Sequence, residues 1–263
     1  CSNRTLNYYK DNINKMFDAV NLPVNEITTE ILRNYLADYK SNSSAGMVTI
    51  DNIRRTLSSF FAWLENEDYI VKSPVRKINK VKTTRKVKET LTDENLEKLR
   101  DTYSNVRDLA ILELLISTGM RVGKITRLNI SDMNFQERSC IVLGKGNSER
   151  EVYFSAKNKM YIKKYLETRT DDNEALFVSL IKPYNRLGIS GIEILIRNLG
   201  KEANINKVHP HKFRRTMATM AIDKGMSIEQ VQKLLGHIKI DTTMEYAMLS
   251  QNNVKNSHRK YIT

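Results

Sequence analysis

Four side chains near the C-terminal end of the sequence have the chemistry to hold and cleave a phosphodiester. His211 and Arg214 stand three residues apart, so they would share one face of a helix. His237 and Tyr246 follow in the next segment. Arginine binds phosphate oxygens, histidine transfers protons, and a tyrosine hydroxyl can act as a nucleophile, all without a metal. Taken alone, a His-x-x-Arg pair is more often an ordinary surface pair than a catalytic one.

Local signals predict where the helices that carry these residues begin and end. Pro210 is typical of the first turn of a helix, where unpaired backbone N–H groups favour an anion. The segment 227–230 reads Ser-Ile-Glu-Gln and fits a capping box. Gly236 is well suited to end that second helix in the left-handed conformation. These signals favour phosphate binding by this region, but they are not sufficient to establish it.

A break between two helices is what would bring His237 and Tyr246 together. On one continuous helix, a separation of nine residues would place the two side chains on opposite faces. Asp241 or Thr242 can cap a new helix that carries the tyrosine. We therefore expect both side chains to point into one cleft.

Five motifs, in order, resemble those of the tyrosine recombinases, also called phage-type integrases. They are a first arginine motif at 117–123, a hairpin lysine motif at 144–150, the His-x-x-Arg element at 211–214, Leu-Gly-His at 235–237, and Tyr246 at the usual distance from that histidine. Each motif is weak by itself, but five in the right order are a strong signal.

The resemblance implies which residues would bind the phosphate. Attack on a phosphodiester builds negative charge on the non-bridging oxygens, and Arg121 and Arg214 would bind these oxygens. Losing one such preorganised donor costs on the order of 100-fold in rate or more. His237 would hydrogen-bond the phosphate or orient the tyrosine.

The proton transfers fall to the remaining site residues. A tyrosine hydroxyl, with an ordinary pKa of about 10, needs help to lose its proton. His211 is the best candidate for that base, Tyr246 is the nucleophile, and Lys145 would protonate the departing 5′ oxygen. The 3′-phosphotyrosine bond conserves the energy of the broken bond, so resealing needs no ATP. We expect no cofactor and no metal, because the acidic residues around the hairpin (Asp132, Glu137, Glu149 and Glu151) are scattered.

Two positions depart from the family's pattern. The family commonly has Glu after the Arg-Val-Gly triplet, whereas Lys124 stands there in this chain. A helper carboxylate is thus absent or supplied elsewhere. Arg215 stands where many members have His, and we interpret it as a DNA-backbone contact or a structural residue.

The sequence predicts a mainly α-helical protein with a small β-hairpin or sheet and two domains. Apolar residues at helical spacing predict a helical bundle over residues 1–72. This bundle is similar to the family's core-binding domain, a SAM-like bundle. We expect its aromatic cluster, Phe60, Phe61 and Trp63, to be core. Residues 91–263 would form the catalytic domain and its C-terminal tail. The resemblance implies a C-shaped clamp on DNA.

Local signals in the catalytic domain predict where its first helices and its hairpin begin and end. Thr92 should cap a first helix, and an apolar helix through 109–116 should stop at Gly119. Residues 139–143 and 152–154 predict the two strands of a hairpin around a Gly-rich turn.

A basic connector over residues 73–90, with Lys72 at its edge, should run along a phosphate backbone as a strap. The formal net charge of +13 favours a polyanionic partner. A charge run is usually a solvated linker, but this one lies between two domains of a strongly basic chain. The strap comprises Lys72, Arg76, Lys77, Lys80, Lys82, Arg85, Lys86 and Lys88.

The resemblance implies further partners and a place in the cell. It implies double-stranded DNA as substrate, a tetramer in the synaptic complex from chains that are monomeric off DNA, and accessory DNA-bending or directionality factors. The tail 247–263 could link subunits. No apolar run approaches the roughly 18–20 residues that span a bilayer. Two cysteines fit a reducing compartment, so we expect the cytoplasm, with nucleoid association on DNA.

Alternatives to a recombinase remain at this point. A type IB topoisomerase shares the same chemistry, and a DNA-binding accessory protein would keep the strap without catalysis. The chain begins at Cys1 rather than Met, from which we expect a mobile-element integrase that lacks an arm-binding domain.

Overall fold

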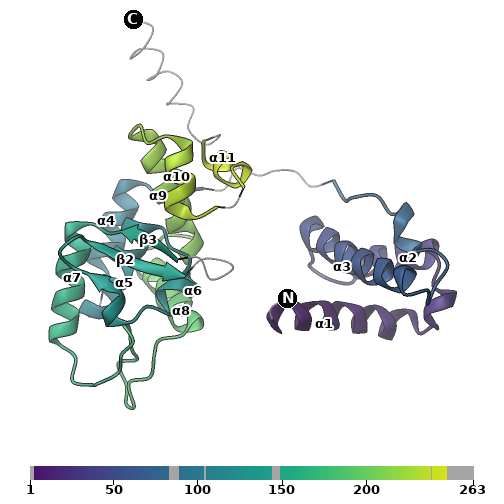
Figure 1. The fold of residues 1–263 in the computed structure, drawn as a ribbon, viewed down its shortest axis with the longest axis horizontal. Helices are drawn as coiled ribbons and strands as arrows, with labels where there is room; N and C mark the ends of the chain where they lie inside the picture. Colours follow the sequence, from purple (N-terminus) through teal and green to yellow (C-terminus); the bar gives the residue numbers. More distant parts are fainter. Residues whose placement is uncertain (1–2, 83–88, 104, 144–148, 238, 248–263) are drawn as a thin grey trace, which may run out of the picture. The chain divides into compact units, whose positions relative to one another are not determined.

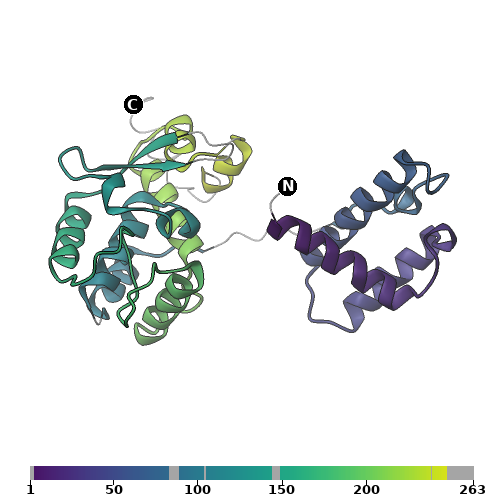
Figure 2. The ribbon, with the colours of Figure 1, turned by 60° about the horizontal axis from the view of Figure 1, so that its bottom comes forward.

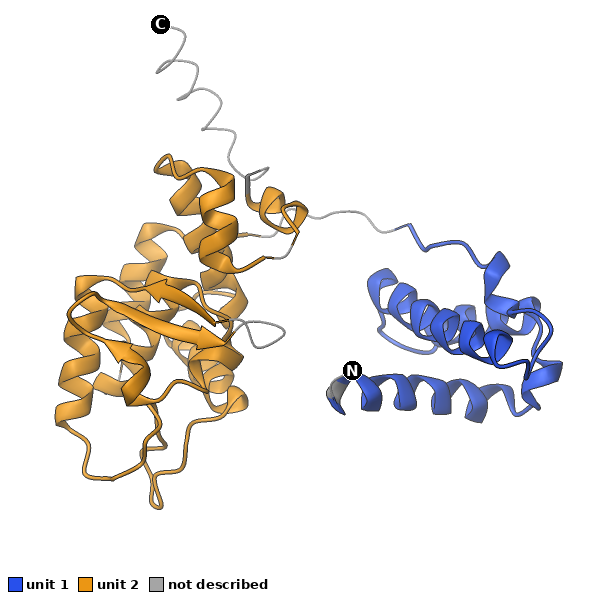
Figure 3. Ribbon diagram, viewed as in Figure 1, with its two compact units in different colours: residues 1–86 blue, residues 87–263 orange. Residues whose placement is uncertain are grey.

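The chain consists of two compact units that are connected near residue 86 (Figure 3). The computed structural model describes residues 3–82, 89–103, 105–143, 149–237 and 239–247. The first unit comprises residues 1–86 and the second comprises residues 87–263. Each is described here by itself.

The first unit is a helical bundle around a single apolar core (Figures 1 and 2). Met16, Leu32, Leu57 and Phe61 are fully buried in it. The predicted helical spacing is therefore confirmed. Its elements are α1 (Asn3–Val20), η1 (Val24–Glu26), α2 (Thr29–Ser41), α3 (Met47–Asn66) and η2 (Pro74–Lys77).

One aromatic residue differs from the prediction. Phe61 is core and Phe60 is half-buried against it, but Trp63 is 50% exposed. The expectation for Trp63 was wrong because its position on α3 faces outward. Its ring lies 5.8 Å from that of Tyr69, which is also exposed.

The first part of the basic connector packs on the bundle rather than hanging free. Val75 is buried against the core, and the hydroxyl of Thr29 donates to the Pro74 carbonyl at 2.7 Å. Further along, the Val81 N–H donates to the Asp51 carboxylate at 3.2 Å. Apolar residues spaced through the charge run hold it in place while its basic side chains stay exposed.

The second unit is built around α5 (Val106–Thr118), an apolar helix buried along its length. Leu109, Ile111, Leu112 and Leu115 are at most 2% exposed. The predicted stop is confirmed, since Gly119 ends α5 in the left-handed conformation with φ 56°. Helices α4 (Asp93–Asp101), α7 (Ala156–Glu167), α8 (Ile189–Glu202) and α9 (Pro210–Asp223) complete the packing around it.

A three-stranded antiparallel sheet covers part of this core. Its strands are β1 (Met133–Asn134), β2 (Ser139–Leu143) and β3 (Glu149–Tyr153), in that order. Cys140 pairs with Val152, and both are buried. The third strand begins earlier than the predicted 152–154, because β2 pairs along its whole length as far as Glu149.

Three helices at one end of the second unit carry the predicted site (Figure 1). Pro210 occupies the first turn of α9, and Ser227 makes the predicted capping box with Gln230. Gly236 ends α10 in the left-handed conformation with φ 62°. The predicted break before Tyr246 is present. The remaining elements are α6 (Val122–Ile125), η3 (Ile130–Asp132), α10 (Ile228–Leu235) and α11 (Asp241–Ala247).

Candidate active site

Arg214 is fixed at the centre of the site by two helix ends. Its side chain is 1% exposed. Nη1 donates to the Gly119 carbonyl at 2.9 Å, and Nη2 donates to the Leu235 carbonyl at 2.8 Å. Helix carbonyls carry partial negative charge where a helix ends, so both contacts suit a cation. The turns at Gly119 and Gly236 therefore set the position of the guanidinium.

A hydrogen-bond chain determines the state of His237. Arg214 Nη2 lies 2.8 Å from His237 Nε2, and His237 Nδ1 lies 2.8 Å from the hydroxyl of Thr243. A guanidinium can only donate, so Nε2 accepts and the ring hydrogen is on Nδ1. Burial, then the charge of Arg214, lowers the pKa of His237 to about 4. The ring is thus neutral at neutral pH, with one defined tautomer.

Tyr246 lies directly against this chain. Its ring stacks on His237 with centroids 5.9 Å apart and planes 29° apart. The side chain is 5% exposed and packs in a small cluster with Met217, Val231 and Leu235. The predicted nucleophile therefore lies beside the predicted phosphate ligands His237 and Arg214.

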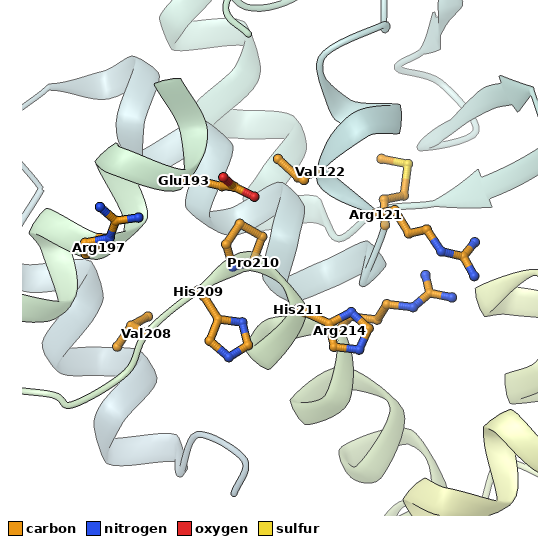
Figure 4. Close-up of a pocket in the computed structure, with 10 residues that line it drawn as sticks. Arg121, Val122, Glu193, Arg197, Val208, His209, Pro210, His211 and Arg214 are labelled. Atoms are coloured by element: carbon orange, nitrogen blue, oxygen red, sulfur yellow. The ribbon is translucent and has the colours of Figure 1, made fainter. Parts of the chain in front are cut away.

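The two motif arginines converge, as the proposed chemistry requires. Figure 4 shows the guanidinium groups of Arg121 and Arg214 extending toward the same side of the pocket. Burial, followed by the charge of Arg121, lowers the pKa of Arg214 to about 10, and the contact with Tyr246 opposes that shift. The guanidinium still carries its charge at neutral pH. Two positive charges thus face one space.

A cavity of about 500 Å³ opens beside these arginines (Figure 4). Arg121, His211 and Arg214 line it together with His209, the residue that caps α9. His211 is exposed in the first turn of that helix, where a base could reach an incoming substrate. The structure therefore brings together five of the six predicted catalytic residues. Lys145 lies outside the described residues.

Two residues of the site were not predicted from the sequence. Thr243 is fully buried and holds the His237 ring. Arg150, on β3, lies against the backbone of Gly236 and close enough to Arg214 to lower the pKa of that side chain. Arg150 belongs to the hairpin lysine motif, but that motif was considered for its lysine alone. The placement of Thr243 three residues before the tyrosine was the only available signal for it.

Lys124 supplies a cation where the family commonly has a carboxylate. Its Nζ donates to the Leu143 carbonyl at the end of β2. Burial and the charges of Arg127, Arg150 and Arg121 lower its pKa. Lys124 therefore anchors the base of the hairpin instead of balancing Arg121.

The comparisons with known proteins identify the family of this chain. Residues 89–253, well over half of the chain, match the model of the phage integrase family.

The chain belongs to that family.

Individual relatives extend the likeness to nearly the whole chain. Tyrosine recombinase XerC of Staphylococcus aureus strain USA300 is 28% identical in an alignment of 267 positions, which covers 97% of this chain and 89% of the relative. The XerH recombinase bound to its difH substrate superposes with a TM-score of 0.81 at 20% identity, over 98% of this chain and 80% of the other. A lambda integrase dimer on a core site gives 0.76 at 21%, over 94% and 72%.

Membership of the family confirms the prediction of a tyrosine recombinase, an enzyme of site-specific DNA recombination. The predicted mainly helical fold with a small antiparallel sheet is confirmed as well. In the part of the chain that the structure describes, no helix is both long and apolar enough to cross a membrane.

The predicted DNA-binding residues lie in different settings. Lys72, Lys77, Lys80 and Lys82 are exposed on the first unit, and Arg76 is exposed but 3.5 Å from Glu65. Arg85, Lys86 and Lys88 lie outside the described residues. Arg215 is 8% exposed and donates to the Glu89 carbonyl at 3.2 Å. This contact within the protein fits the structural role that we considered for Arg215. Its contact with DNA stays a prediction.

Proposed function

We propose that this recombinase exchanges strands between specific sites in duplex DNA, with Tyr246 as the nucleophile. The observation that supports this most directly is that four separate segments of the chain bring Arg121, His237 and Tyr246 next to Arg214. A duplex DNA substrate fits the charge of +13 and the DNA-bound state of the XerH and lambda integrase structures.

The reaction begins with attack on the scissile phosphorus. The phenolic oxygen of Tyr246 forms a bond to phosphorus as its proton passes to His211. The bond from phosphorus to the 5′ oxygen breaks, and that oxygen takes a proton from Lys145 to leave as a 5′-hydroxyl. The DNA keeps a 3′-phosphotyrosine bond. Attack by a 5′-hydroxyl of the partner strand reverses these steps, so neither ATP nor a metal is consumed.

The arginines lower the barrier of both steps. Negative charge grows on the non-bridging oxygens as the pentacoordinate transition state forms. Arg214 is held in place before substrate arrives, so its charge is available without rearrangement. Neutral His237 keeps that guanidinium aligned by accepting its hydrogen bond.

The first unit and its strap hold the DNA. We infer that Lys77, Lys80 and Lys82 contact the phosphate backbone while the two units close on the duplex as a C-shaped clamp. Four protomers would assemble on two sites, linked through the tail 247–263. The accessory factors expected for such systems would bend DNA or set direction.

A suicide substrate with a nick beside the cleavage position tests this proposal. After cleavage, the short fragment between the cleavage position and the nick, which carries the new 5′-hydroxyl, diffuses away. The covalent adduct therefore cannot be resealed and accumulates. We expect an adduct with wild-type protein and none with Tyr246→Phe. Relaxation of supercoiled plasmid without exchange between two sites would favour a topoisomerase. No adduct on any cognate DNA, with binding intact, would favour an accessory DNA-binding protein.

A further inference from the structure

Arg150 lies against the turn that precedes His237. A Cβ atom added to Gly236 would lie 1.7 Å from Nη1 of Arg150, so the guanidinium occupies the space that only glycine leaves open. Two constraints therefore favour glycine at position 236: the contact with Arg150, and a φ of 62°, which disfavours a side chain. This contact carries a cation from β3 to the edge of the site.

The Arg150 guanidinium is incompletely satisfied. Nη1 is buried and has no hydrogen-bond partner among the described residues. Leaving a buried donor on a charged group unpaired is unfavourable. Arg100 provides the contrast, because its guanidinium reaches the buried Glu113 carboxylate at 2.5 Å. No described carboxylate forms an ion pair with Arg150 in this way.

Like charges surround Arg150. Burial, followed by the charge of Arg121, lowers the pKa of Arg150, and Arg150 in turn helps to lower the pKa of Arg214 and of His237. The charges of Arg121, Arg150 and Arg214 therefore act on one another, and no described carboxylate forms an ion pair with any of the three. Such a cluster is unfavourable in the free protein and becomes favourable once an anion enters it.

We propose that Arg150 is a third arginine that binds the scissile phosphate through a non-bridging oxygen. The role rests on the proposed strand-exchange function and extends it to a residue outside the six predicted catalytic residues. The unpaired Nη1 supplies the donor, and the contact with Gly236 sets its distance from Arg214. The cation at this edge would take up part of the charge that grows in the transition state.

The test measures single-turnover adduct formation on two forms of the suicide substrate. One carries the normal scissile phosphodiester, and the other a methylphosphonate, which removes one negatively charged oxygen at that position. Arg150→Met keeps the aliphatic stem without the charge, and Arg150→Lys keeps a charge without the planar guanidinium. Arg138→Met is the control on an exposed arginine in the turn between β1 and β2.

On the phosphodiester, we expect Arg150→Met to react on the order of 100-fold more slowly than wild type, with Arg150→Lys in between. On the methylphosphonate, Arg150→Met should come within about tenfold of wild type, because less charge needs stabilising. Equal slowing on both substrates, or no slowing, would overturn the proposal. If wild type itself forms no adduct on the phosphodiester, strand exchange by this chain fails instead.

A thermal measurement on the free protein separates a structural role further. Removing a cation from a like-charged cluster should leave the Tm of Arg150→Met equal to or above that of wild type. A fall in Tm together with equal slowing on both substrates would make Arg150 a packing residue only.

Discussion

Arginines in two parts of the second unit have opposite surroundings. Away from the site, on α4 and at the start of α5, Arg100 lies 2.5 Å from the Glu113 carboxylate and Arg107 lies 2.7 Å from that of Asp108. Both carboxylates are largely buried, and each offsets the positive charge of the arginine that it contacts. These arginines hold α4 and the start of α5 in place.

Around the site, Arg121, Arg150 and Arg214 form no ion pair with any described residue. Arg214 donates to two carbonyls and to a neutral histidine, and it also contacts the side chain of Tyr246. The difference teaches that the residue type does not distinguish structure from function, whereas the presence of a neutralising carboxylate does. An uncompensated cluster that the fold nevertheless assembles implies an anionic substrate.

Glu113→Gln should produce the largest change, and in stability rather than in catalysis. It leaves the Arg100 guanidinium without its buried partner, which typically costs about 3–5 kcal/mol. Chemical denaturation would measure the free energy of unfolding. Glu97→Gln, at the exposed end of the same arginine, should change it by about 1 kcal/mol or less. Similar losses from both variants would remove the distinction between the two settings.

Arg121→Ala and Arg214→Ala should each slow adduct formation by about 100- to 1000-fold, since each removes a donor to the transition state. DNA affinity, measured by a mobility shift, should remain near that of wild type because the strap still binds. Affinity that falls in step with cleavage would contradict their assignment to transition-state stabilisation.

His237 should make stability depend on pH in an acidic window. Its folded pKa of about 4 lies below the ordinary value of 6.5, so the unfolded chain binds more protons between these values. The stability that neutral His237 contributes is complete above about pH 6.5 and is lost as the pH falls toward about 4. The slope should approach about 1.4 kcal/mol per pH unit and be shallower in His237→Asn. Parallel curves for both proteins would refute it.

Thr243→Val should slow cleavage by up to about tenfold, the worth of one hydrogen bond. Without its acceptor at Nδ1, His237 can move its hydrogen to Nε2 and lose the contact with Arg214. Thr243→Ser retains the hydroxyl and should recover most of the rate. A serine variant as slow as the valine variant would point to packing instead.

Replacing Lys77, Lys80 and Lys82 with Gln should have the smallest effect on the chemistry. Adduct formation at saturating protein should be unchanged. Each lost phosphate contact should reduce the slope of log affinity against log salt by about 0.9. Lys201→Gln, an exposed site on α8, is the control. An unchanged slope would rule out the strap.

Local signals predicted the frame of the site well. Pro210, Gly119 and Gly236 act through backbone geometry within one turn, so their sequence context was sufficient. The motif residues followed from the resemblance, and the structure shows why their spacing works, since the ends of α5 and α10 meet at Arg214.

Contacts between distant segments were not predictable in this way. Arg150 matters because β3 approaches the end of α10, and Thr243 because α11 folds back on His237. Trp63 has the apolar character of a core residue, yet the face it occupies on α3 lies outside the bundle. In the sequence, the connector resembled a solvated linker because most of its residues are charged or polar. The apolar Val75 among them packs into the core of the first unit.

The most direct test of the central claim is to digest the trapped adduct and identify the modified residue by mass spectrometry. The chain has 12 tyrosines, so the assignment is discriminating. The account predicts that a nucleotide is attached through its 3′ phosphate to Tyr246. Attachment to another tyrosine, or to a residue of another type, would contradict it.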